Sequence, residues 1–594
     1  MSTAVEHGTE NGSTDQPADS VATLTAHQLR PGLAVTPLRD GLHLRGWRSS
    51  VTLEGSRALP ALWQLLAQAL HTGDHAALTE RAPVGSPLRT ALNTLIGHLH
   101  THDLLVARSD TASPWLRAAA ADPAAAAAAI AAARPRVLAA DPAGPIAQAA
   151  ARALRRAGAE PTVAAGPAGL LLLAQGPAGP TAIAALVTAD GGFVTAPGSP
   201  EQAAADATAL TTRLDLAADD TPSTPITPPA PTTLGTFGTL VAAAAAQRLL
   251  CAVAGLPDPA HEGEDERVLP DRPAVLVADA RPPRADYRTW LGPRLLDPER
   301  TTPLPAPDTL REALRRAAAL GDERVGPLPP ALPGALPQLP VALVACAQPE
   351  GTLLAAGART DLARLDAVCR AAELRLSDGE SQVTVGATAD HAWSRALRRA
   401  ATRHAAGARP GEPLPEESWA AHPQARHWWR TLSERIGIQA ELTMRQLGTG
   451  GHSATVRAAG RPLGRAIEAT PGDAATFAAL GALAHIVSEG LDLTISHFSL
   501  PSGASAPLAV AGLEPAGWED EGWTTGWLAG LAAREATLRA HLRTELHRAS
   551  APDPAPWTPW TPWTPADTEP AAQALLAALH SCGFTVLRTP GAAR

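Results

Sequence analysis

The sequence predicts a protein of several domains in which helices and strands are mixed. Its 594 residues are too many for one ordinary hydrophobic core. Hydrophobic residues make up 45% of the chain, enough to fill several cores. Alternating stretches and helical periods follow one another along the sequence, which is typical of α/β layers. We therefore expect a multidomain α/β fold.

The overall charge and the cysteines exclude several classes of protein. A net charge of −9 gives no basic field for nucleic acid, and no apolar run reaches the ~20 residues that a bilayer requires. Residues 1–20 are polar and lack a signal-peptide pattern, so we expect a disordered tail on a cytoplasmic protein. Four scattered cysteines in apolar surroundings predict buried thiols, and the absence of lysine excludes a Walker A lysine or a Schiff base.

Residues 21–108 predict a small winged-helix unit. Alternating stretches separated by turn residues indicate an antiparallel sheet, and three helical periods follow. The stretches are 33–37, 41–45 and 50–54, and the helices are 59–71, 74–81 and 86–100. Ser86 and Pro87 are suited to begin the last helix as its N-cap and first-turn residue.

Residues 125–300 predict a Rossmann-like domain. After an Ala-rich helical connector, a strand, a loop, an apolar helix and a second strand follow in βαβ order. A further strand is expected at 169–174 and a long helix at 238–256. The first loop, DPAGP at 141–145, has one glycine in place of GxGxxG, so we expect no phosphate cradle there.

Residues 305–594 predict a further α/β domain, whose segments alternate between strand and helix patterns. Strands are expected in VALVACA and QVTVGA, and helices at 357–377, 390–404 and 471–487. Near the end stands WTPWTPWTP, in which polyproline II geometry would place Trp557, Trp560 and Trp563 on one face.

The order of these units resembles the leader-binding proteins of azole and thiopeptide antibiotic biosynthesis. Two segments carry the resemblance further, LRPGLAVTPLRDGLHLRGW in the first unit and LGTFGTLVAAAAAQRLLCAVAGL in the second. In that family a winged-helix recognition element for ribosomally made, modified peptides (RiPPs) is followed by a ThiF-like scaffold and a YcaO-like region. The resemblance implies that the chain binds a precursor's leader and forms a hetero-oligomer with a YcaO cyclodehydratase. That partner uses ATP and magnesium to form azolines from Cys, Ser or Thr.

The YcaO-like region departs from the family where magnesium ligands are expected. ATP-binding members carry one Glu, a second Glu three residues later and an Arg beside it; RLDAVCRAAELRLS places Arg370, Glu373 and Leu374 there. Arg399 stands at an expected acidic position of the next helix. One carboxylate cannot replace several oxygen ligands. We therefore expect no catalytic residue, metal or cofactor in this chain, with ATP and magnesium in the partner.

The ThiF-like region also lacks residues with which the family binds a metal. Where the family has PGxxPCxxC, this chain reads APGSPEQAAAD, with Glu201 and Ala203 near the positions of the zinc-binding thiols. We expect neither zinc binding nor adenylation here.

The resemblance implies that the leader lies between the third strand and the third helix of the recognition element. Val51 and Leu53 share one face of the strand at spacing two, and a leucine stripe follows the helix. The candidate leader-binding residues are Arg48, Val51, Leu53, Leu88, Arg89, Leu92 and Leu95. The two arginines would meet acidic leader side chains at the rim. Alternatively, the aliphatic residues fill the winged helix's own core.

Two other functions remain open from the sequence. A self-sufficient cyclodehydratase would need a carboxylate cluster in the last region, which Glu373 and its neighbours do not supply. A winged-helix DNA-binding regulator would need a basic recognition helix, whereas 86–100 carries only Arg89.

Overall fold

The computed structural model describes residues 20–588 except 23, 47–48, 178, 217–230, 264, 378–381, 408–411, 449, 513–522, 550–560 and 563–569. Arg48, the three tryptophans of WTPWTPWTP and the polar tail up to residue 19 lie outside the described residues.

Two compact units interleave along the chain. The first is Met1–Ala182 with Ala242–Pro259, and the second is Ile183–Val241 with Ala260–Arg594. The mixed α/β fold is confirmed, and the predicted domain boundaries stay predictions.

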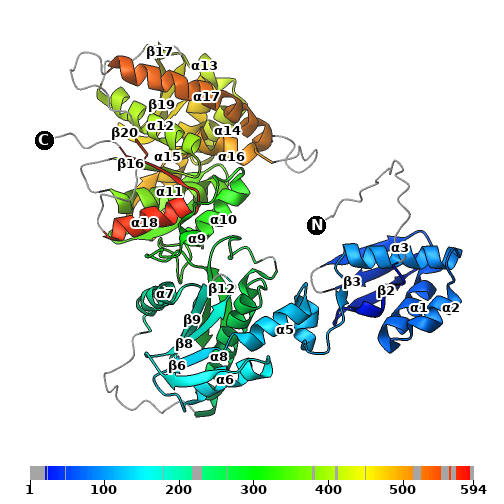
Figure 1. Ribbon diagram of the computed structural model, residues 1–594. Helices are drawn as coiled ribbons and strands as arrows, with labels where there is room; N and C mark the ends of the chain where they lie inside the picture. The colour runs from blue at the N-terminus through cyan, green and yellow to red at the C-terminus, as the bar shows by residue number, and fades with distance from the viewer. Residues whose placement is uncertain are drawn as a thin grey trace. The chain divides into compact units, whose positions relative to one another are not determined.

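The first unit begins with the three strands and three helices that the sequence predicts (Figure 1). The strands are β2 (Ala34–Leu38), β3 (Gly41–Arg45) and β4 (Ser50–Glu54), and the helices are α1 (Leu59–Thr72), α2 (His75–Arg81) and α3 (Pro87–Thr101). The sheet is antiparallel in the order β2-β3-β4, so β4 lies at an edge. A second small sheet pairs β1 (His27–Leu29) with β5 (Leu105–Ala107).

Local sequence explains where α3 begins and which face it buries. The Ser86 hydroxyl accepts a hydrogen bond from the backbone N–H of Arg89 at 3.2 Å, and Pro87 occupies the first turn without losing a helical hydrogen bond. Leu92, Ile96 and Leu99, at helical spacing, are fully buried against the rest of this small core.

The rest of the first unit contains the predicted βαβ motif. Its strands β6 (Arg136–Ala139) and β7 (Thr162–Ala165) are parallel and joined by α6 (Pro145–Arg156), while β8 (Leu170–Gly176) runs antiparallel to β6. The Ala-rich connector, predicted as one helix, is two helices, α4 (Pro114–Ala119) and α5 (Pro123–Ala132). The break occurs because Asp122 caps α5, accepting hydrogen bonds from the backbone N–H groups of Ala124 and Ala125.

Helix α8 (Pro231–Val253) qualifies the expectation that no apolar run has bilayer length. Gly235–Val253 is long and apolar enough to cross a membrane, but 61% of its most apolar window is buried inside the protein. More than half of that stretch therefore lies in the protein's own interior.

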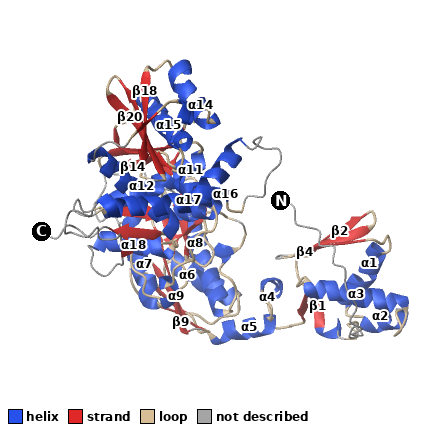
Figure 2. Ribbon diagram, turned by 90° about the horizontal axis from the view of Figure 1, so that it is seen from above, coloured by secondary structure: helices blue, strands red, loops and turns tan. Residues whose placement is uncertain are grey.

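The second unit begins with antiparallel strands and continues into several α/β layers (Figures 1 and 2). The first strands are β9 (Gly179–Val187), β10 (Gly191–Val194), β11 (Ala274–Ala280) and β12 (Pro283–Thr289), accompanied by α7 (Pro200–Arg213), α9 (Pro298–Thr301) and α10 (Leu310–Leu320). Each of these strands pairs with the next along the chain.

Three further sheets follow, of orders β13-β14-β15-β21, β16-β23-β22 and β17-β18-β19-β20. Their strands are β13 (Ala331–Leu332), β14 (Ala342–Gln348), β15 (Gly351–Gly357), β16 (Val383–Gly386), β17 (Pro413–Leu414), β18 (Ala440–Leu447), β19 (Gly451–Ala458), β20 (Arg461–Glu468), β21 (Ile495–Ser499), β22 (Thr561–Pro562) and β23 (Thr585–Arg588). The helices are α11 (Thr360–Leu376), α12 (Ala389–Gly407), α13 (Glu417–Ala420), α14 (Pro423–Arg430), α15 (Pro471–Glu489), α16 (Ala506–Val510), α17 (Trp523–Ala549) and α18 (Pro570–Ser581). One continuous hydrophobic core joins α11, α15 and the strands beside them.

All four cysteines are free and buried, which confirms the sequence prediction. Burial raises the pKa of Cys346 to about 11 and that of Cys369 to about 12. Thiols held protonated in this way are poor nucleophiles at neutral pH.

Candidate functional site

The predicted leader groove between β4 and α3 is only partly open to a ligand. Val51 is buried, and Leu92 and Leu95 are 0% and 2% exposed, so these three side chains fill the unit's own core. Leu53 and Leu88 pack against that core while keeping part of their surface exposed. Among the described candidates, these two are the apolar side chains that a peptide can reach.

Arg89 occupies a structural position rather than the expected rim. Its side chain is 4% exposed, and its Nη1 donates a hydrogen bond to the carbonyl of Ala82 at 3.2 Å. The guanidinium therefore stabilises the connection between α2 and α3. The sequence could not reveal this, because an Arg in the first turn of a helix is more often solvated.

The two edges of this sheet differ in what they offer to another strand. β2 contains Pro37, which has no backbone N–H to donate, and its residues are mostly exposed. β4 contains no proline and places Val51 and Leu53 toward the core. β4 is therefore the better edge for an added peptide strand.

In the second unit, Glu373 of α11 lies at the centre of a group of arginines. Its Oε1 accepts hydrogen bonds from the backbone N–H of Val385 at 3.0 Å and from Arg395 Nη2 at 3.2 Å. Its Oε2 accepts from Arg370 Nη1 at 3.2 Å and from Arg399 Nη2. Each carboxylate oxygen therefore already has two donors.

The electrostatics of Glu373 agree with this geometry. Its side chain is 0% exposed, and burial alone would raise its pKa. The guanidiniums of Arg399, Arg395 and Arg370 outweigh burial and lower the pKa of Glu373 to about 2. Glu373 is thus a permanently charged internal counter-ion.

A second buried ion cluster, which the sequence analysis missed, is centred on Arg398 of the same helix α12. Arg398 donates to Glu468 at 2.6 Å and to Glu535 at 2.5 and 2.7 Å, and the backbone N–H of Gly503 donates to Glu468 at 2.8 Å. All three ionic side chains are nearly inaccessible to solvent. No local motif signals this cluster, because its members are up to 137 residues apart.

The carboxylates of these two clusters already have guanidinium partners, so they do not form an open magnesium site. The described acidic residues of both clusters are occupied by guanidiniums, and no group of three His, Cys, Asp or Glu among the described residues can hold a metal. A cation entering beside these arginines would meet like charge.

A buried Ser–His pair in the same unit resembles a nucleophile and its base, but its tautomer is wrong for that role. The backbone N–H of Ala387 donates to His391 Nδ1 at 3.1 Å, so the ring proton lies on Nε2 and is donated to Ser505 Oγ at 3.0 Å. Burial lowers the pKa of His391 to about 3. His391 therefore cannot accept the Ser505 proton in this arrangement.

Near the expected zinc position, at the start of α7, the structure has a buried polar network. Asp206 Oδ2 accepts from Arg300 Nη1 at 2.6 Å, and Asp206 Oδ1 accepts from Trp290 Nε1 at 2.8 Å and from Gln202 Nε2 at 2.9 Å. This network links α7 to α9 and the end of β12.

Two solved structures resemble the chain along most of its length. A heterocyclase in complex with substrate and cofactor is 12% identical, covers 95% of this chain and 94% of its own, and has a TM-score of 0.43. The heterocyclase TruD is 13% identical, with coverages of 95% and 93% and a TM-score of 0.40. No family model matches the chain. No curated protein matches it either.

Proposed function

We propose that the chain is the leader-binding, non-catalytic subunit of a complex that forms azolines in a ribosomally made peptide, in thiopeptide or linear azole peptide biosynthesis. It binds the precursor's leader beside β4 and presents the core to a separate YcaO cyclodehydratase. That partner holds ATP and magnesium, and the complex is a cytoplasmic hetero-oligomer that needs no nucleic acid or membrane.

The observation that carries this proposal is the open edge of β4. A strand at the edge of a sheet can pair with an extended peptide through backbone hydrogen bonds, while side-chain pockets provide selectivity. Leu53 and Leu88 are the partly exposed apolar side chains beside this edge. An apolar residue of the leader can cover them.

The role of presentation, rather than catalysis, is supported by the ion clusters around α12. Glu373 and Glu468 already bind guanidiniums, so neither carboxylate is available to a magnesium ion. Holding a core peptide near the partner's active site raises its effective concentration without any chemistry in this chain.

The DNA-binding alternative is weakened by the same helix that suggested it. Arg89 is the one Lys or Arg in α3, and its guanidinium is buried against Ala82. It cannot neutralise a phosphate unless the connection between α2 and α3 opens.

Hydrogen exchange on the intact chain tests the proposal. A leader added to β4 should protect the amides of residues 50–54, because their outward N–H groups gain partners, while β2 should stay unchanged. The same experiment with a scrambled leader is the control. Protection at β2, or none in the sheet at saturating leader, would contradict the proposal.

A further inference from the structure

A cavity of about 680 Å³ lies beside α11, α12 and β20. Six arginines line it, and no Asp or Glu is among its lining residues in the described part of the chain. The arginines are Arg370, Arg395, Arg398, Arg399, Arg403 and Arg465. Ser499, Ser502 and Thr402 add hydroxyl groups to the wall.

The acidic residues that pair with these arginines balance only part of their positive charge. Four of the arginines form the ion pairs with Glu373, Asp366, Glu468 and Glu535. The side chains of Arg403 and Arg465 have no hydrogen bond or ion pair within the described residues, so six cations face four anions. Arg403 is exposed at the rim, and its partial burial lowers its pKa.

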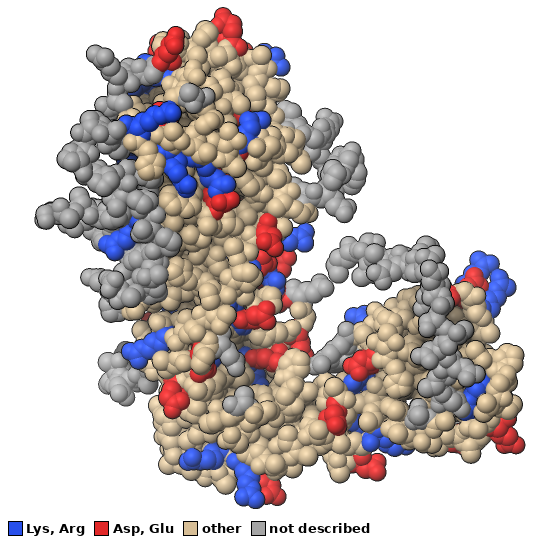
Figure 3. Space-filling view, turned by 45° about the horizontal axis from the view of Figure 1, so that its top comes forward, with Lys and Arg blue, Asp and Glu red and all other residues tan. Residues whose placement is uncertain are grey.

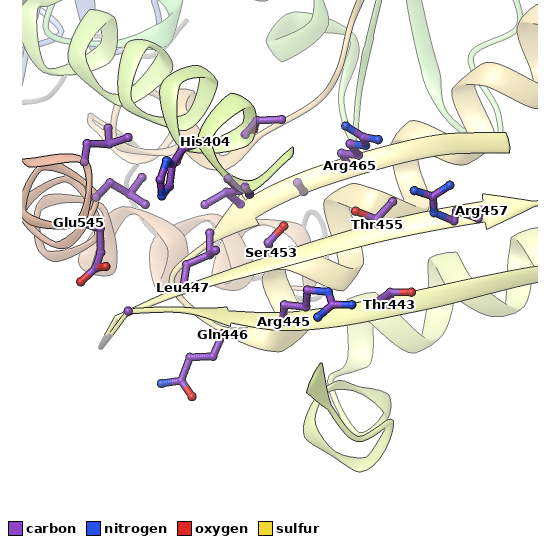
Figure 4. A pocket seen from close by; sticks show the side chains of 18 residues that line it. His404, Thr443, Arg445, Gln446, Leu447, Ser453, Thr455, Arg457, Arg465 and Glu545 are labelled. Atoms are coloured by element: carbon purple, nitrogen blue, oxygen red, sulfur yellow. The ribbon is translucent and has the colours of Figure 1, made fainter. Parts of the chain in front are cut away.

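A neighbouring cavity of about 460 Å³ extends the positive surface (Figure 4). It shares Thr402, Arg465, Ala466 and Ile467 with the first cavity. The register of β18, β19 and β20 places Arg445, Thr455 and Arg465 on one face of the sheet. Glu545 is the acidic residue among its lining residues, and it is paired with Arg548 at 2.5 Å.

Figure 3 shows one face of the protein, on which several blue side chains lie close together in the upper part, with red side chains at its upper edge and beside them.

We propose that this arginine-lined cavity binds a phosphate-bearing small molecule, of the diphosphate class, without a metal ion. Guanidinium groups match phosphate oxygens in pairs, and they keep their charge at any physiological pH. The cavity has the volume of a small-molecule site. Arg403 and Arg465, which form no ion pair with carboxylates of the described residues, are available to attract a phosphate group.

The absence of a metal is a specific part of the proposal. In a carboxylate site magnesium bridges protein and phosphate, so it strengthens phosphate binding. Here the arginines replace the metal, and magnesium would compete with them for the phosphate oxygens. Magnesium should therefore weaken binding.

Calorimetry on the full chain with inorganic pyrophosphate tests this. We expect saturable binding that is tighter for pyrophosphate than for phosphate and is weakened by excess Mg²⁺. Arg403→Gln and Arg465→Gln should each weaken it roughly tenfold, in keeping with the loss of one charge-assisted contact. Arg311→Gln removes the same charge from exposed Arg311 of α10, outside both cavities, and should change nothing.

Parallel titration with Mg²⁺-free ADP distinguishes the two sources of a diphosphate. Tighter binding of ADP supports a nucleotide, and equal or weaker binding supports free diphosphate. The proposal fails if pyrophosphate does not bind, if Mg²⁺ strengthens binding, if Arg311→Gln weakens it as much as the cavity variants, or if a glutamate-rich peptide binds more tightly. Circular dichroism confirms that each variant is folded.

Discussion

Arg395 Nη2 and Glu373 Oε1 lie 3.2 Å apart where α12 meets α11, and both side chains are almost completely buried. This contact uses a carboxylate as an internal counter-ion at a position where the family resemblance implies a metal ligand. The negative charge of Glu373 is compensated by the protein's own guanidinium groups. Removing Glu373 would leave Arg370 and Arg399 without the carboxylate that pairs with them, while Arg395 would keep its ion pair with Asp366.

The first prediction concerns the stability that Glu373 provides. Glu373→Ala leaves Arg370, Arg395 and Arg399 without their shared anion, and losing one partner of a buried ion pair costs about 3 to 5 kcal/mol. Urea unfolding should show a loss of that size. Glu441→Gln, which removes an exposed carboxylate of β18, should change the free energy of unfolding by less than about 0.5 kcal/mol. Similar losses in both variants would show that Glu373 has no special role.

Acid sensitivity provides a second prediction. The pKa of His391 is lowered from 6.5 to about 3, first by burial and then by Arg395, while Glu373 opposes the shift and Arg398 adds to it. The unfolded chain therefore binds a proton that the folded chain does not, and stability should fall as the pH drops from about 6.5 toward 3. Glu373, whose pKa is lowered from 4.5 to about 2, adds a further loss between those values.

The His391→Gln variant isolates the first of these two groups. One proton accounts for at most about 1.4 kcal/mol of stability per pH unit. The slope of unfolding free energy between pH 6 and 5 should therefore be smaller in His391→Gln than in the unaltered protein. The slope is compared, rather than the absolute stability, because the variant also changes the contact with Ser505. An unchanged slope would show that another group is responsible.

The sequence predicted local structure well because local signals determine it. Ser86 and Pro87 mark the start of α3, and the period of Leu92, Leu95 and Leu99 marks its buried face. The substitution of Arg370 for a carboxylate was also visible in one sequence. The triple pairing of Glu373 and the Arg398 cluster were not, because they depend on which helix faces α12 in space. The buried position of Arg89 could not be predicted either, because it depends on the fold that brings the Ala82 carbonyl to its guanidinium.

A third prediction tests the network at the start of α7. Asp206→Ala should lower stability by about 3 kcal/mol, because it removes the nearer of the two carboxylates that pair with the buried Arg300 guanidinium and leaves only Asp297 at 3.7 Å. Treating the unaltered protein with a zinc chelator should leave the thermal midpoint unchanged, because this network of side chains links the elements directly. A lowered midpoint after chelation would overturn this interpretation, and Glu160→Gln on the exposed surface is a matched control for the substitution.

The fourth prediction is that the isolated chain does not hydrolyse Mg-ATP. Glu373 and Glu468 are occupied by arginines, so neither carboxylate is available to the metal. Phosphate release from Mg-ATP should stay at the background rate, and calorimetry should show no Mg²⁺-dependent binding. Micromolar binding that requires Mg²⁺ and is lost in Glu373→Gln would contradict this prediction.

The last prediction concerns the leader site, where the structure changes which substitutions are informative. Val51, Leu92 and Leu95 are core residues, so changing them would unfold the unit without testing binding. Leu53 and Leu88 are partly exposed, and covering one aliphatic side chain is worth roughly 1.5 to 3 kcal/mol. Leu53→Asp and Leu88→Asp should therefore each weaken leader binding at least tenfold, since about 1.4 kcal/mol corresponds to a factor of ten.

Fluorescence anisotropy with a labelled leader measures this change, and circular dichroism confirms that each variant is folded. Val35→Asp is the matched control, because Val35 is 38% exposed on β2, the edge that contains Pro37. The control should bind the leader with unchanged affinity, since its strand offers fewer backbone donors to a peptide. If Val35→Asp weakens binding while Leu53→Asp and Leu88→Asp do not, the leader pairs with β2 instead. If all three folded variants bind normally, the leader lies outside this sheet, and the open edge of β4 is not the recognition site.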